Sequence, residues 1–186
     1  MTPIPLGILD FPTAAGSYDL LETQVLSSSA SSVTFTGLGS YSDYKHLQIR
    51  YTLRGVDNAA NLDLIQWTFN GTVGGSDYAY HRLRGYNSTV SSSASSSQSL
   101  MYSGIFPDDG QDGGIFGAGV ADILDFSSSS KNKTLRVFDG SWFTSFPNVY
   151  LSSGLYNDTT PVTSITMASD KSGWVAGSRI SLYGVK

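Results

Sequence analysis

The clearest pattern along the chain is a strict alternation of apolar and polar residues between positions 45 and 54. Leu47, Ile49, Tyr51 and Leu53 occupy every second position, and the residues between them are polar or basic. Successive side chains of a β-strand point to opposite faces, so a period of two predicts a strand with one buried face and one exposed face. The exposed face of this strand is expected to be basic and polar.

Residues 62–70 repeat the alternation through Ile65, Trp67 and Phe69, which places Trp67 on the buried face. This segment ends at Asn70 and Gly71, a dipeptide that suits the positive φ angles of a tight turn. We therefore predict a strand followed by a hairpin or loop. Shorter runs of the same character predict further strands at residues 20–26, 33–38, 78–84, 100–106, 119–126, 134–138, 149–156, 164–168 and 179–185.

The composition strengthens the β prediction. Fourteen of the fifteen acidic residues are Asp and only Glu22 is Glu, while 31 of the 186 residues are Ser. Asp and Ser bond locally to the backbone in caps and turns, whereas Glu favours helix interiors. The number of expected strands suits two packed antiparallel sheets. The sequence thus predicts an all-β chain with an antiparallel, jelly-roll-like β-sandwich over residues 17–186.

Residues 1–16 differ in character from this body. They hold three of the six prolines and several small residues, which favours an extended N-terminal arm that is ordered by packing on something else. Two serine-rich stretches, residues 91–99 and 127–130, lie between expected strands. Their composition predicts mobile surface loops.

Charge and cysteine content limit the partners of the chain. Eleven basic and fifteen acidic residues give a net charge of -4, and no basic run could follow a phosphate backbone, so we expect no nucleic-acid partner. No segment approaches the roughly 20 apolar residues of a membrane helix, and the N-terminus lacks the basic start of a secretion signal. The chain has no Cys, so neither disulfides nor thiolate metal sites contribute and subunit contacts become an option for stability.

Catalytic chemistry has little support in the sequence. His46 and His81 are the only imidazoles, and Ser76 and Asp77 are the nearest local partners for a triad at His81, but no G-x-S-x-G elbow accompanies either. A glycosidase needs two opposed carboxyl groups, and most Asp residues lie in turn-like contexts where they bond to backbone. Asp122 and Asp125, beside apolar residues of an expected strand, are the exceptions. We expect a protein that is not an enzyme.

A metal site is a second chemical possibility. Asp108, Asp109 and Asp112 superficially suggest a calcium loop, but its third and twelfth positions are Gly110 and Gly119, where an EF-hand needs oxygen ligands. Either an irregular Ca²⁺ site or a solvated acidic turn fits these three residues. The glycines nearby form no nucleotide-binding motif, and we expect no cofactor.

Aromatic residues offer a third possibility, since flat rings pack on the apolar faces of sugars. Trp142 and the tyrosines Tyr41, Tyr44 and Tyr86 lie near turns and are the best placed for exposure. Packing in a core or between subunits is the competing interpretation for each of them.

Two segments carry a resemblance to a known group of proteins. Residues 67–71 and 76–85 read W-T-F-N-G and S-D-Y-A-Y-H-R-L-R-G, and the C-terminal residues 174–186 read W-V-A-G-S-R-I-S-L-Y-G-V-K. They resemble patterns in small virion-associated proteins of tailed bacteriophages. The resemblance covers much of the body but not the arm, implies a phage structural protein, and carries over no catalytic residues. Tyr78, Tyr80, His81 and Arg82 are expected to fix a strand edge and turn by hydrogen bonding, and Gly177 and Gly184 to allow tight bends.

These observations give a ranked set of expected functions. The first is a capsid decoration (cement) protein on the virion exterior, made in the host cytoplasm, trimeric, and bound to the major capsid protein or other virion proteins with the arm reaching neighbours. The second is a receptor-binding or glycan-binding module of a tail fibre or tail tip, with a host-surface glycan as partner. A polysaccharide hydrolase using two Asp residues ranks third.

Overall fold

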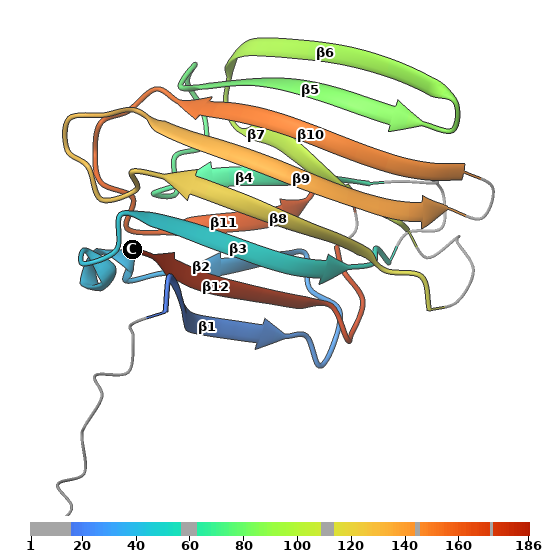
Figure 1. The fold of residues 1–186 in the computed structure, drawn as a ribbon, viewed down its shortest axis with the longest axis horizontal. Coiled ribbons are helices and arrows are strands. Elements are labelled where there is room, and N and C mark those ends of the chain that lie inside the picture. The colour runs from blue at the N-terminus through green and yellow to red at the C-terminus, as the bar shows by residue number, and fades with distance from the viewer. Residues whose placement is uncertain (1–15, 57–62, 109–113, 144–145, 172) are drawn as a thin grey trace, which may run out of the picture.

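The chain folds into two antiparallel β-sheets packed face to face (Figure 1), in a computed structural model that describes residues 16–56, 63–108, 114–143, 146–171 and 173–186. The large sheet has eight strands in the order β1-β12-β3-β8-β9-β10-β5-β6, and the small sheet has four in the order β2-β11-β4-β7. The prediction of an all-β antiparallel sandwich is confirmed. The strands are β1 (Tyr18–Val25), β2 (Ser32–Phe35), β3 (His46–Leu53), β4 (Asp63–Phe69), β5 (Tyr78–Tyr86), β6 (Thr89–Gln98), β7 (Met101–Phe106), β8 (Gly117–Leu124), β9 (Lys133–Phe143), β10 (Phe146–Tyr156), β11 (Ile165–Ser169) and β12 (Arg179–Val185).

The core lies between the sheets and follows from the alternation. Leu47, Ile49, Tyr51 and Leu53 are buried on one face of β3, as their period of two predicts, while Arg50 is exposed on the other face. Trp67 is fully buried on β4 of the small sheet, where its indole Nε1 donates a hydrogen bond to the carbonyl of Ser103. The predicted interior position of Trp67 is confirmed.

The turn after β4 also matches its sequence. Asn70 and Gly71 both have positive φ angles, 56° and 66°. The Tyr78 hydroxyl accepts a hydrogen bond from the Phe69 N–H at 2.9 Å and so ties the start of β5 to the end of β4, which confirms the predicted role for Tyr78. Gly177 has a positive φ of 87°, which fits the expected bend before β12.

Gly184 has a different role from the predicted bend. It lies within β12, and a Cβ at this position would run into the ring of Tyr44. Because glycine has no side chain, Tyr44 packs over the strand and its hydroxyl donates to the Asp19 carboxylate at 2.9 Å. Glycine is thus needed here for space.

The serine-rich stretch 91–99 is where the sequence prediction is wrong. Ten of the eleven residues from Thr89 to Ser99 are Ser, Thr, Gln or Val, and all but the last belong to strand β6, paired with β5 from Tyr86↔Thr89 to Tyr78↔Gln98. β6 is the edge of the large sheet and is exposed along most of its length. An edge strand needs backbone hydrogen bonds on one side only, so it forms without an apolar pattern. Residues 127–130 do form a surface turn.

The two sheets differ in width, and this determines what stays exposed. Two hairpins, β5–β6 and β9–β10, lie side by side and widen the large sheet to eight strands, and we call them the hairpin extension. β9 runs from Lys133 to Phe143, well beyond the predicted end at Phe138. Residues 1–15 of the predicted arm lie outside the described residues, and the chain enters the fold at β1, the opposite edge of the large sheet (Figure 1).

Candidate interaction surface

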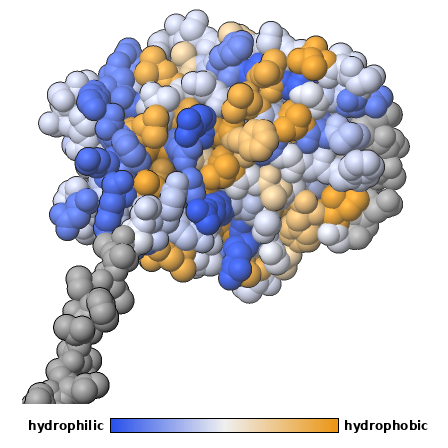
Figure 2. All heavy atoms as spheres, in the orientation of Figure 1, coloured by the Kyte–Doolittle hydropathy of each residue, from blue (hydrophilic) through white to orange (hydrophobic). Residues whose placement is uncertain are grey.

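The outer face of the large sheet, the one turned away from the small sheet, carries a row of apolar side chains. Val120 on β8, Phe138 on β9, Leu151 on β10 and Leu83 on β5 are direct register partners across four adjacent strands. Phe138, Leu151 and Leu83 are 55%, 47% and 44% exposed. We call these four residues the outer apolar row; Figure 2 shows apolar side chains gathered over this part of the sheet.

Further apolar side chains flank the row on the same face. Val149 lies two residues before Leu151 on β10, Leu155 lies four residues after it, and Trp142 lies four residues after Phe138 on β9. All three are exposed, Trp142 by 60%. Exposed and half-buried apolar side chains on four neighbouring strands are uncommon on monomeric proteins and mark contact sites for other macromolecules.

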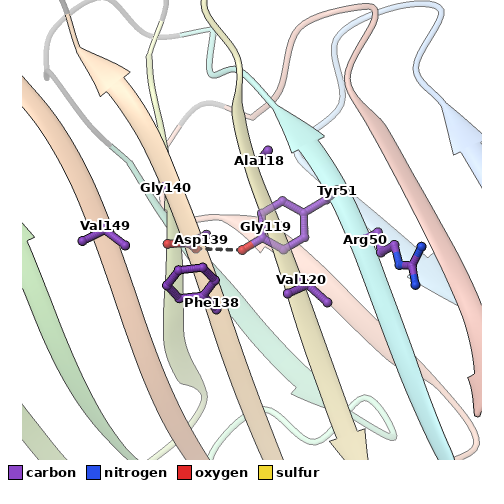
Figure 3. Close-up of a pocket in the computed structure, with 9 residues that line it drawn as sticks. All are labelled: Arg50, Tyr51, Ala118, Gly119, Val120, Phe138, Asp139, Gly140 and Val149. Carbon is purple, nitrogen blue, oxygen red and sulfur yellow. Dashed lines mark hydrogen bonds between the residues drawn. The ribbon is translucent and has the colours of Figure 1, made fainter.

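The row borders a hollow of about 450 Å³ (Figure 3). Its floor is low because Ala118 and Gly140, which face each other across β8 and β9, have little or no side chain. Val120, Phe138 and Val149 stand around it, and Arg50 closes one end. The hollow and its apolar rim form a surface that could accept a protruding apolar side chain of a partner.

A buried hydrogen-bonded bridge lies under this floor. The Tyr51 hydroxyl donates to Asp139 Oδ2 at 2.7 Å, and the backbone N–H of Ile105 donates to the same oxygen at 2.8 Å. Gly119 is the register partner of both Tyr51 and Asp139, and a Cβ there would overlap the tyrosine ring. The glycine lets the ring cross β8, so β3 and β9 are joined to β7 of the small sheet.

Burial raises the pKa of Asp139 to about 7, although the hydrogen bonds from Tyr51 and the Ile105 N–H act in the opposite direction. Its second oxygen, Oδ1, is buried and has no hydrogen-bond partner among the described residues. Burial likewise raises the pKa of Tyr51. The bridge is closed to solvent and positions the strands under the hollow, which makes Asp139 a structural residue of this surface.

Asp63 is a second buried carboxyl that the sequence did not single out. Ser169 Oγ donates a hydrogen bond to Asp63 Oδ2 at 2.8 Å. The Leu64 N–H donates to both Asp63 Oδ1 and Asp170 Oδ1. Burial raises the pKa of Asp63 to about 7, and the neighbouring Asp170 carboxyl adds to the shift. This cluster joins β4 to the end of β11.

The predicted catalytic candidates are dispersed. His46 Nδ1 accepts a hydrogen bond from the Asp125 backbone N–H, and His81 is exposed on the outer face of β5. No serine hydroxyl is hydrogen-bonded to either imidazole in the described part of the chain. Asp122 accepts from Gln48 and pairs with Arg136, and Asp125 pairs with Lys131. Each of these carboxylates thus has a structural partner.

Of the three Asp residues considered for a calcium site, only Asp108 is among the described residues, and it is buried beside β7. Asp109 and Asp112 lie outside the described residues. Among the residues that the structure describes, no group of three or more His, Asp and Glu side chains could hold a metal ion. Within the same residues, no helix is long and apolar enough to cross a membrane.

The aromatic candidates differ in their exposure to solvent. Trp142 is exposed on the outer face, whereas Trp174 is buried against Phe106 with ring centroids 6.0 Å apart. Tyr41, Tyr44 and Tyr86 are half-buried. Of these aromatic candidates, Trp142 is therefore the most available to a ligand.

Comparisons of the chain with protein-family models, with curated proteins and with solved structures found no match in any of the three.

Proposed function

We propose that the chain is a structural protein of tailed-bacteriophage virions and, more specifically, a capsid decoration protein bound to the particle exterior. The observation that carries the proposal is the outer apolar row, since an uncovered apolar sheet face is stabilised when another protein covers it. The resemblance of residues 67–71, 76–85 and 174–186 to virion-associated proteins supports the choice of partner. In this account the partner is the major capsid protein or another virion protein.

A finer proposal concerns the fold. Without the hairpin extension, the large sheet reads β1-β12-β3-β8 and the small sheet reads β2-β11-β4-β7. These eight strands then have the order expected of a jelly roll with two four-stranded sheets. We interpret β5–β6 and β9–β10 as hairpins added to a jelly roll. Three of the four residues of the outer apolar row belong to them, so the additions carry the contact surface.

Oligomerisation is part of the same proposal. β6 is a ten-residue exposed edge strand with no charged residue and no Pro, and such edges are prone to pair with another chain. We propose a homotrimer, with residues 1–16 of each subunit reaching a neighbour. Sedimentation equilibrium should give three times the 19.9 kDa chain mass; a monomer at all concentrations would contradict the trimer.

Binding to particles assembled without this chain tests the decoration proposal. Phe138→Asp and Leu151→Asp place charges in the outer apolar row and should weaken co-sedimentation with particles about thirtyfold or more, as for central contact residues. Ser32→Asp adds the same charge at an exposed position of β2, in the small sheet, and this variant should bind like the native chain. Equal binding by all four proteins would contradict the proposal.

Antibody labelling of intact virions locates the protein. Dense labelling over the head is the result we expect, and no labelling of any particle would overturn the virion proposal. Labelling confined to the tail would instead favour the second candidate function, a receptor-binding or glycan-binding module. The 60% exposure of Trp142 is the observation that favours this candidate, which predicts host-cell binding that is lost in Trp142→Ala.

A further inference from the structure

The inner face of the large sheet changes character where the sheet extends past the small one. The first residues of β5, Tyr78 and Tyr80, are buried on this face. Further along the same face β5 carries Arg82 and Arg84, whose register partners on β6 are Ser93 and Ser91. β6 is exposed on both faces, so this end of the sheet is not covered. A polar pocket of about 210 Å³ lies here, lined by Arg82, Arg84, Ser91, Ser92, Ser93 and Tyr150.

Both arginines are held in place by tyrosine rings. The Arg84 guanidinium carbon lies 4.4 Å from the ring centre of Tyr86 and 5.4 Å from that of Tyr150, and Arg82 lies 5.2 Å from the ring centre of Tyr80. Asn148 Oδ1 accepts hydrogen bonds from Arg84 Nε and Nη2 at 3.0 and 2.9 Å. Stacking fixes the plane of a guanidinium and leaves its N–H edge available to a ligand.

Neither arginine is neutralised in the fold. Within the described residues neither forms an ion pair with a carboxylate, although the chain as a whole is acidic. Arg82 Nε is buried and has no hydrogen-bond partner there. Two adjacent unpaired cations repel each other, and a buried donor without a partner costs free energy, so an anionic ligand would relieve both.

We propose that this pocket binds an anionic saccharide through its carboxylate or phosphate group. Guanidinium groups recognise both anions by paired hydrogen bonds. Ser91 and Ser93 stand beside the arginines, and hydroxyl groups both donate and accept, which matches the hydroxyls of a sugar better than it matches a bare anion. The site goes beyond the proposed decoration role and lies on the opposite face from the outer apolar row.

Calorimetric titration of the full chain with glucuronate, glucose 6-phosphate, inorganic phosphate and glucose tests the proposal. We expect saturable binding of at least one anionic sugar, at least tenfold weaker binding of phosphate alone, and none of glucose. Comparing glucuronate with glucose 6-phosphate identifies the anion. Binding of neither anionic sugar at millimolar concentration, or equal binding of phosphate alone, would overturn the saccharide assignment.

Matched variants assign the binding to the pocket. Arg82→Gln should weaken binding of the preferred sugar at least tenfold without lowering the melting temperature, because it removes an unneutralised cation and a buried Nε donor that has no partner in the described fold. Ser93→Ala should weaken it several-fold. Arg50→Gln removes an arginine that stacks on Tyr183 on the outer face and should bind like the native chain. Equal affinity of native chain and Arg82→Gln would overturn the site. Arg82 is outside the outer apolar row, so a failure here is separable from a failure of particle binding.

Discussion

Strand β3 and the hairpin extension of the large sheet differ in polarity on the same faces. On β3 the outer face carries the polar residues Gln48, Arg50 and Thr52, and the inner face carries Ile49, which packs in the core with Leu182 of the neighbouring β12. In the hairpin extension the outer face carries three of the four residues of the outer apolar row, and at its β5–β6 end the inner face carries arginines and serines. The first arrangement fits a sheet that buries one face in its own core. The second fits strands whose faces are directed at other molecules.

The largest effect should come from comparing two leucines of the same sheet. Leu182→Ala on β12 removes a fully buried side chain and should lower the free energy of unfolding by about 3 kcal/mol. Leu151→Ala in the outer apolar row, where the leucine is 47% exposed, should cost less than about 1 kcal/mol. Urea unfolding of both variants checks the difference, and equal losses would show that the row is part of the core.

Two lysines at the start of the extension provide a second comparison. Lys133 is fully buried and its Nζ donates to the carbonyls of Ser128, Lys131 and Thr159 at 2.7, 2.6 and 3.1 Å. Lys133→Met removes these charge-assisted bonds and should cost about 2 to 3 kcal/mol. Lys131, an exposed partner of Asp125, is the control, and Lys131→Met should cost less than about 1 kcal/mol. A melting temperature of Lys133→Met equal to that of the control would contradict this role.

The buried bridge under the hollow predicts a pH dependence. The carboxyl of Asp139 has a pKa of about 7 when folded, against an ordinary value of 3.8. Between these values the folded chain retains a proton that the unfolded chain has released, so the free energy of unfolding falls as pH rises. The slope for one group is about 1.4 kcal/mol per pH unit.

Asp139→Asn keeps an oxygen acceptor for Tyr51 but does not titrate. From pH 5 to pH 7 its stability should therefore fall by about 2 kcal/mol less than that of the native chain, measured by urea unfolding. A residual fall is expected because the pKa of Asp63 is raised in the same way. Identical pH profiles for the two proteins would contradict the raised pKa of Asp139.

The smallest change in the free energy of unfolding is expected for a variant that makes the outer apolar row more polar. Replacing Leu83 and Leu151 together by Ser should alter the free energy of unfolding by less than about 1 kcal/mol, because both side chains are nearly half exposed. The same double variant should bind less of a dye that reports exposed apolar surface. Unchanged dye binding would argue that the outer apolar row is not an accessible patch.

Most of the strands can be predicted from the sequence because a strand with one covered face has apolar residues at every second position. Leu47 to Leu53 and Ile65 to Phe69 have this period, and their strands are as predicted. β6 has no such pattern because neither of its faces is covered. The outer row did leave a signal: Val149, Tyr150 and Leu151 are consecutive and apolar, which is typical of a strand with both faces buried.

Asp139 and the arginine pocket were not predictable from local pattern. Asp139 follows Phe138, where the alternation was expected to end, and its partners Tyr51 and Ile105 are distant in sequence. Arg82 and Arg84 lie at alternate positions of a predicted strand, but only the register with β6 places Ser91 and Ser93 beside them. Such sites depend on which strands become neighbours.

Side-chain oxidation footprinting on particles tests most directly whether the hairpin extension is a contact surface. Oxidation of Phe138 and Trp142 by hydroxyl radicals would be compared between the free chain and the particle-bound chain, with exposed Tyr18 on β1 as the internal control. The account predicts that Phe138 and Trp142 become strongly protected on the particle while Tyr18 changes little. Unchanged oxidation of Phe138 and Trp142 in the bound protein would contradict it.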